Sequence, residues 1–160
     1  MGAGLRLREA APGDEALVLR FVRELAEYER LLHEVRATEE ALHNSLFGTP
    51  PRGYALIAEE DGREVGLAVW FFTLSTFDGR PGLYVEDVFV TPAARGRGIG
   101  RAIFRDLARR ALAADCTRME WSVLDWNAPA LRFYRAIGAQ PVAGWTVQRL
   151  NGAALTALAA

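Results

Sequence analysis

Apolar and polar positions along the chain predict a strand followed by a long amphipathic helix near the N-terminus. Residues 5–9 alternate between apolar and polar side chains, which is typical of a strand. A turn at Pro12-Gly13-Asp14 then precedes a stretch whose apolar residues recur every three or four positions, the spacing of one helix face. These apolar residues are Leu17, Phe21, Leu25 and Tyr28, with Leu31 and Leu32 following.

The middle of the chain predicts a short helix and then three strands. Thr38 is a suitable N-cap for a helix through Ser45. Residues 54–59 and 64–73 have strand character, and the Asp61-Gly62 pair between them favours a tight hairpin. Residues 83–90 form a third apolar strand, which is interrupted by Glu86 and Asp87.

The C-terminal half predicts two more helices and two more strands. A helix is expected to about Ala114, with an apolar stripe of Ile99, Ile103 and Leu107 opposite a solvated stripe of Arg101, Arg105 and Arg109. Residues 119–124 and 145–150 are expected to be strands, and the alanine-rich tail is compatible with a helix. Asn127 and Pro129 have the positions of an N-cap and a first-turn proline, in a helix that ends at Ile137 before Gly138. The order βα(α)βββαβαβ predicts one mixed α/β domain over residues 1–160.

Composition excludes several classes of function. The net charge is −1 and the isoelectric point is about 6.1, whereas nucleic-acid binders usually carry a basic excess. No segment approaches the ~20 apolar residues that span a bilayer, so no membrane partner is expected. The single cysteine, Cys116, cannot form an internal disulfide and favours the cytoplasm, and two histidines are too few for a His-based metal site.

A glycine-rich turn after the strand at 83–90 carries the most informative pattern. It contains Gly96, Gly98 and Gly100 and leads directly into a helix. The first N–H groups of a helix lack internal partners, the helix dipole places positive charge there, and glycines let a ligand approach the backbone. Such a turn can bind phosphate, and Arg95 and Arg97 add charge, although a plain surface turn gives the same pattern. The Gly-Lys-Ser/Thr ending of a P-loop is missing, and the turn is a poor dinucleotide fingerprint.

Taken with its neighbours, this turn resembles that of the GNAT acetyltransferases. Arg95-Gly-Arg-Gly98-Ile-Gly100 matches their Arg/Gln-x-x-Gly-x-Gly/Ala signature, and Val90-Thr91-Pro92 matches its lead-in. A later family element appears as Asn127, Phe133-Tyr134 and Gly138-Ala139. The stretches 25–31, 72–77, 81–87 and 123–127 further resemble the spermidine/spermine (diamine) branch, which includes enzymes acting on thialysine. The resemblance covers about residues 5 to 155.

The resemblance implies a mostly antiparallel sheet flanked by helices, in which a splayed strand pair binds acetyl-CoA. It implies that Val88, Phe89 and Val90 pair with the pantetheine arm and that Val88 N–H is an oxyanion donor. The diphosphate would lie on the turn, and Asn127 would contact the cofactor as well as cap its helix. The cofactor-binding residues so implied are Val88, Phe89, Val90, Arg95, Gly96, Arg97, Gly98, Ile99, Gly100, Arg101, Asn127, Pro129 and Tyr134. No metal is implied.

For catalysis, the resemblance implies that Tyr134 protonates the departing coenzyme A sulfur and that Glu86 assists deprotonation of the amine. Strand alternation would turn Glu86 and Asp87 to opposite faces, with Glu86 beside Tyr84 and Val88. Substrate-side residues would be Tyr28, Glu29, Glu86 and Asp87, which form an acidic groove suited to a cationic amine. The alternative for Tyr134 is a core aromatic, and the alternative for each carboxylate is an ion pair or a solvated surface position.

The expected function is acetyl transfer from acetyl-CoA to a primary amine of a small molecule, by direct attack on the thioester. Two alternatives stay open. One is a protein or peptide amine as the acceptor, and the other is a non-catalytic module that binds acetyl-CoA. Relatives in this branch are usually homodimers, so the resemblance also implies a homodimer.

Overall fold

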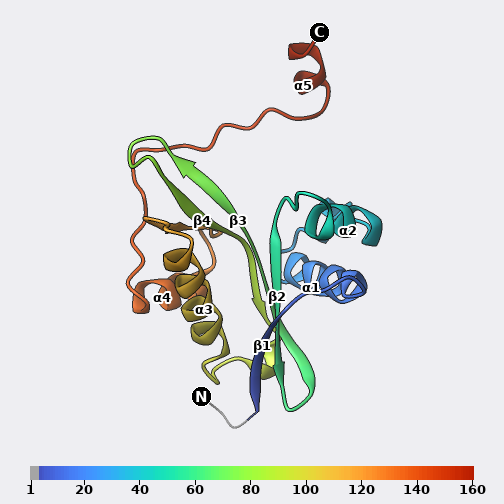
Figure 1. The fold of residues 1–160 in the computed structure, drawn as a ribbon, viewed down its shortest axis with the longest axis vertical. Coiled ribbons are helices and arrows are strands. Elements are labelled where there is room, and N and C mark those ends of the chain that lie inside the picture. Colours follow the sequence, from blue (N-terminus) through green and yellow to red (C-terminus); the bar gives the residue numbers. More distant parts are fainter. Residues whose placement is uncertain (1–3) are drawn as a thin grey trace. The chain divides into compact units, whose positions relative to one another are not determined.

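The computed structural model describes residues 4–160, which form a five-stranded sheet with helices. The elements in chain order are β1 (Leu5–Glu9), α1 (Glu15–Tyr28), a 3-10 turn (Leu32–Glu34), α2 (Glu39–Phe47), β2 (Tyr54–Glu60), β3 (Arg63–Ser75), β4 (Arg80–Val90), a second 3-10 turn (Pro92–Ala94), α3 (Ile99–Ala113), β5 (Met119–Glu120), α4 (Ala128–Ala136) and α5 (Gly152–Leu158). The predicted order of elements is confirmed as far as α4 (Figure 1).

The chain divides into two compact units, Met1–Leu124 and Asp125–Ala160. The first unit contains the whole sheet and α1 to α3, and the second contains α4 and α5. Within residues 4–160, no helix is both long enough and apolar enough to cross a membrane.

The sheet is mixed but mostly antiparallel, as the sequence predicts. Its strands follow the order β1-β2-β3-β4-β5, and only the β4–β5 pair is parallel. The β2–β3 connection is the expected Asp61-Gly62 hairpin, and both residues have positive φ (52° and 76°), as a type I′ turn requires.

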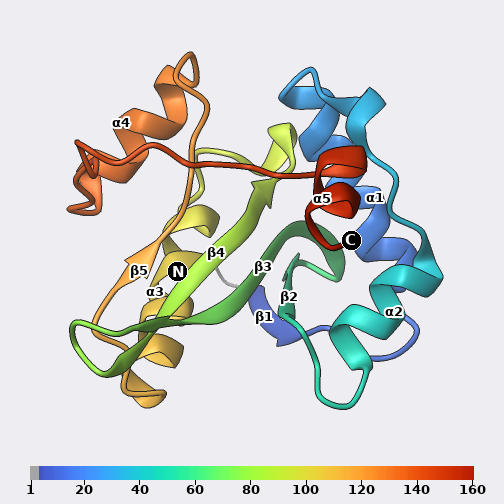
Figure 2. The same cartoon turned by 90° about the horizontal axis from the view of Figure 1, so that it is seen from above.

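Two layers of side chains cover the sheet. On one face, Val18 and Phe21 of α1 and Leu46 of α2 pack with Ile57, Leu67 and Phe89 of the sheet. On the other face lies α3, whose predicted stripe of Ile99, Ile103 and Leu107 is almost completely buried. Figures 1 and 2 show α1 and α2 on the side of the sheet away from α3. The apolar core therefore positions the middle of α1 and the start of α3 against the sheet.

The end of α1 departs from the simple apolar repeat. Arg30 has a φ of 62°, and Leu31 N–H donates to Ala26 O at 2.7 Å, the closure of a Schellman motif. Leu31 and Leu32 consequently leave the helix and are exposed. Tyr28 and Glu29 thus occupy the helix terminus.

Two sequence expectations for strands are wrong. Residues 145–150 form no strand, and the strand expected at 119–124 is limited to Met119 and Glu120. The apolar residues of 145–150 are exposed, and a strand depends on packing and pairing with neighbours rather than on its own sequence pattern. The alanine-rich tail does form a short helix, α5.

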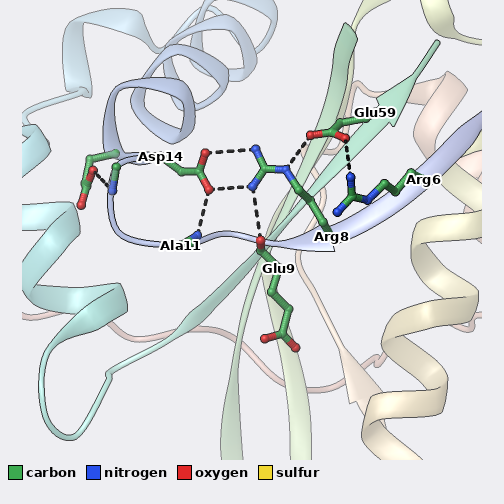
Figure 3. A network of polar contacts seen from close by, with 8 residues as sticks. Arg6, Arg8, Glu9, Ala11, Asp14 and Glu59 are labelled. Carbon is green, nitrogen blue, oxygen red and sulfur yellow. Dashed lines mark hydrogen bonds and ion pairs between the residues drawn. The ribbon is translucent and has the colours of Figure 1, made fainter. Parts of the chain in front are cut away.

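The start of α1 is tied to the sheet by a polar network (Figure 3). Arg8 of β1 binds both carboxylate oxygens of Asp14, at 2.7 and 3.0 Å, and Glu59 of β2 at 2.5 Å. Asp14 also accepts a hydrogen bond from Ala11 N–H at 2.8 Å. These side chains are largely shielded from solvent, and the Arg8 guanidinium holds the pKa of Asp14 below its usual range. The network fixes where α1 begins.

Asp14→Ala is therefore expected to lower the free energy of unfolding by about 2 kcal/mol. The substitution removes the carboxylate that accepts hydrogen bonds from the Arg8 guanidinium and from Ala11 N–H. Denaturant titration at pH 7 measures the change. Glu34→Ala removes one member of the exposed His33–Glu34 pair and is the control, with an expected change below about 0.5 kcal/mol. Equal changes in the two variants would contradict a structural role for the network.

Candidate functional site

A β-bulge in β4 determines how its two acidic residues are placed. In the β3–β4 ladder, Trp70 lies opposite Val85 and Val69 lies opposite Asp87, so Glu86 is the extra residue. A bulge interrupts the alternation of faces along a strand. Asp87 consequently shares a face with Val69 and Phe89, the face that packs against α1 and α2.

The bulge overturns the expectation that Glu86 and Asp87 point to opposite faces. Both line one pocket of about 320 Å³. Regular alternation would have turned Glu86 to the face opposite Asp87 and Phe89, and the extra residue in β4 removes that alternation at Glu86. The pocket therefore receives two carboxylates from consecutive residues.

The pocket is mostly apolar and lies between the sheet and the helices of one face. Its walls come from α1, α2 and β3, and one basic residue, Arg52, reaches it from the segment before β2. The apolar wall residues are Val18, Val22, Ala37, Leu42, Leu46, Val69, Trp70 and Phe71. Sequence reasoning did not assign these walls or Arg52 to the site. The α1 residues of the wall, Val18 and Val22, lie beside the predicted stripe of Leu17, Phe21, Leu25 and Tyr28, and an apolar residue type does not distinguish a pocket wall from core.

Negative charge gathers around Asp87. Burial, together with the charges of Glu86 and Glu29, raises the pKa of Asp87 to about 6. Burial also raises the pKa of Glu29, which caps the C-terminal end of α1. The structure thus brings together three of the predicted substrate-side residues, Glu29, Glu86 and Asp87, from α1 and β4.

Tyr28, the fourth predicted substrate-side residue, lies beside the glycine-rich turn. The guanidinium carbon of Arg95 is 4.7 Å from the centre of the Tyr28 ring and 5.6 Å from that of Phe89. Arg95 Nε also donates to Val90 O at 2.9 Å. The side chain of Arg95 is therefore directed toward α1 and β4.

Strands β4 and β5 part soon after they meet. They pair at Leu83–Met119 and Tyr84–Glu120, and the Tyr84 hydroxyl lies 2.9 Å from Ser122 Oγ. In the described part of the chain, the ladder between β4 and β5 goes no further, although β4 continues to Val90. This is the predicted splay, and it leaves the β5 side of Val88, Phe89 and Val90 outside the ladder.

The turn after β4 has the backbone of an anion site. Gly96 and Gly98 have φ of 78° and 83°, a region that glycine adopts without strain. Gly98 caps α3, and the first intrahelical bond runs from Ala102 N–H to Gly98 O at 2.9 Å. The N–H groups of Ile99, Gly100 and Arg101 precede that bond, so they are available at the positive end of the helix.

The second arginine of the turn also has protein partners. Arg97 contacts Glu60 Oε2 at 2.5 Å and Ala93 O at 2.9 Å. Arg101 is exposed on the first turn of α3. The side chains of Arg95 and Arg97 thus both have protein partners, whereas the first backbone N–H groups of α3 precede the first intrahelical bond.

Asn127, Pro129 and Tyr134 belong to the second unit. Asn127 Oδ1 accepts a hydrogen bond from Ala130 N–H at 3.3 Å, which confirms its predicted role as an N-cap. Pro129 lies in the first turn of α4, and Tyr134 lies near its C-terminal end beside Phe133. Gly138 follows the helix with a φ of 93°, as its predicted end requires.

Similar proteins agree with this geometry. The model of the acetyltransferase (GNAT) family matches residues 18–139. A thialysine N-epsilon-acetyltransferase of Bos taurus is 40% identical over 98% of each chain. A human spermidine/spermine N(1)-acetyltransferase-like protein 1 is 33% identical over 91% of this chain and 22% of that protein. An integron cassette protein of Vibrio cholerae has a similar solved structure, with a TM-score of 0.81, 26% identity and 99% of each chain covered.

The family match spans most of the chain, including β4, its bulge and the glycine-rich turn. This chain belongs to the GNAT family of acetyltransferases.

Proposed function

We propose that this protein transfers the acetyl group of acetyl-CoA to a primary amine of a small molecule, such as a polyamine, a diamine or a thialysine-like diamino acid. The observation that carries the proposal is the pocket at the β4 bulge, which receives two carboxylates from the same strand that leads into the splayed edge and the glycine-rich turn. The relatives named for thialysine and spermidine/spermine acetylation support this class of acceptor.

Acetyl-CoA would bind along β4 and the turn that follows it. Backbone amides between Arg95 and Arg101 would hold the diphosphate, and Val88 to Val90 would pair with the pantetheine arm as a strand pairs with an edge. Asn127 and Pro129 at the start of α4 would contact the cofactor. No metal takes part in this scheme.

The acceptor would enter the pocket as a cation and react as a free amine. An alkyl amine has a pKa near ~10.4, so a proton must leave before nitrogen attacks the thioester. Glu29, Glu86 and Asp87 would attract the ammonium group. Glu86 would accept the proton, through water, while Asp87 would hold the amine.

Collapse of the tetrahedral intermediate would complete the transfer. The amine nitrogen attacks the carbonyl carbon, Val88 N–H stabilises the oxyanion, and the C–S bond then breaks. Tyr134 would donate its hydroxyl proton to the departing sulfur, and the extra proton on the newly bonded nitrogen would return to the Tyr134 oxygen through water, which leaves a neutral amide and coenzyme A as the thiol. This scheme requires the two compact units to act as one domain over residues 1–160.

The named relatives favour a small acceptor over a protein. The pocket, with a volume of about 320 Å³ and apolar walls, is large enough for a short aliphatic amine. We further propose a cytoplasmic homodimer. The exposed apolar residues of the second unit, including Trp145 and Val147, support the dimer, and the single buried thiol of Cys116 fits a reducing compartment.

An amine panel tests the proposed function directly. Thialysine, spermidine, ornithine and a lysine-containing peptide would each be incubated with acetyl-CoA, and release of coenzyme A would be measured. We expect the small amines to react with kcat/KM at least tenfold above that of the peptide. A preference for the peptide would point to a protein acceptor, and binding of acetyl-CoA without turnover of any amine would point to a non-catalytic module.

Tyr134→Phe is expected to lower kcat by about 10²-fold or more, because it removes the acid that protonates the leaving thiolate. The dissociation constant for coenzyme A should stay within about twofold, since the ring is retained. Tyr54→Phe, on an exposed tyrosine of β2 outside the site, is the matched control and should keep full turnover. Unchanged kcat in the Tyr134 variant would remove this residue from the mechanism.

Asp87→Asn is expected to stabilise the protein while lowering its activity. The folded state raises the pKa of Asp87 from 3.8 to about 6, so the free energy of unfolding falls as pH rises through that interval. Above about pH 6 the carboxylate is charged in both states, and the full cost of burying that charge is present. Removing the charge should raise the free energy of unfolding at pH 8 by on the order of 2 to 3 kcal/mol, and by about 1 kcal/mol less at pH 5.

Denaturant titration at the two pH values measures this effect. Asp125→Asn replaces an exposed aspartate and is the control, with an expected change below about 0.5 kcal/mol. If the Asp87→Asn protein were less stable than the wild type at pH 8, the claim that burial and neighbouring negative charges destabilise the Asp87 carboxylate would be wrong.

A further inference from the structure

Arg95 stands out because its side chain connects the cofactor turn to the acceptor end of α1. Its backbone belongs to the glycine-rich turn, directly before Gly96. Its guanidinium nevertheless lies over the ring of Tyr28, at 4.7 Å, and near the ring of Phe89. The proposed role of this side chain as a phosphate ligand does not account for those contacts.

The guanidinium is held on three sides. Nε donates to Val90 O at the last residue of β4, and the buried Phe89 ring in turn packs at 6.2 Å from Phe21 of α1. A guanidinium is planar and can bind a carbonyl at its edge while it stacks on an aromatic face. Arg95 therefore has a defined position set by the end of β4.

The contact with Tyr28 bears on the acceptor pocket. Tyr28 is the last residue of α1, and Glu29 caps the helix. Glu29 is close enough to Asp87 for its charge to raise the pKa of that carboxyl. The chain then changes direction at Arg30, which has a φ of 62°, so Tyr28 and Glu29 lie at the very end of the helix.

We infer that Arg95 is a positioning residue that clamps the C-terminal end of α1, so that the cofactor turn determines where Tyr28 and Glu29 lie relative to Asp87 of the acceptor pocket. The predicted effect on amine binding rests on the proposed function. The contact between Arg95 and the end of α1 rests on the geometry alone. Occupation of the turn by coenzyme A stabilises the clamp and thereby strengthens binding of the amine. The guanidinium acts through Tyr28 and need not touch the substrate.

Amide hydrogen exchange of residues 25–31 tests the structural part, with no need for turnover. In the protein without ligand, Arg95→Gln and Tyr28→Leu should each speed exchange of this segment by about fivefold, the size expected for loss of one cation–π contact. Tyr28→Phe keeps the ring and should keep the slow exchange. Arg105→Gln, which removes an exposed arginine of α3, is the control for loss of charge.

Coenzyme A alone is then added as the probe. It should slow exchange of residues 25–31 in the wild type and in Arg105→Gln, but not in Arg95→Gln. If residues 25–31 exchanged at the wild-type rate in Arg95→Gln, the inference would be overturned. So would a coenzyme A effect that persists in that variant at saturation.

Kinetics separate a clamp from a phosphate ligand. Arg95→Gln and Tyr28→Leu should each raise KM for the amine by at least threefold at saturating acetyl-CoA, and the double variant should raise it no further than the stronger single variant. An additive double variant, or an increase confined to KM for acetyl-CoA, would overturn the clamp. If the wild type acetylates no amine, the proposed function fails, while the exchange result still decides whether the clamp exists.

Discussion

One extra residue in β4 is the constraint on which the rest of the site depends. With Glu86 inserted opposite the Val69–Trp70 step, the strand delivers Glu86 and Asp87 to one pocket and still returns Phe89 to the core. Among the described residues, the same strand pairs with β5 at two positions only, so its edge beyond Tyr84 lies outside that ladder. A regular strand would have placed one carboxylate beneath α3, where an unpaired charge is costly.

Helix α1 forms the opposite wall, and it is held at both of its ends. Arg8 of β1 fixes its start through Asp14, and Arg95 of the glycine-rich turn contacts its last residue, Tyr28. Between these points, Val18 and Phe21 are completely buried. The wall can therefore keep acidic groups close together near Asp87, although their mutual repulsion favours separation.

The sequence allowed most of the scaffold to be predicted, because its signals are local. The Asp61-Gly62 hairpin, the Thr38 and Asn127 caps and the Ile99–Leu107 stripe each depend on residues a few positions apart, and all are confirmed. The bulge depends on register between two strands, which alternation within one strand cannot reveal. Long-range packing likewise decides that residues 145–150 form no strand and that Arg95 turns toward Tyr28.

The most direct test of the account is a crystal structure with coenzyme A and an unreacted amine bound together. The account predicts the amine nitrogen within about 3 Å of a carboxylate oxygen of Asp87 or Glu86, or one water away, with the pantetheine arm along Val88 to Val90. An amine bound outside this pocket, or Glu86 and Asp87 on opposite faces of the sheet, would contradict it.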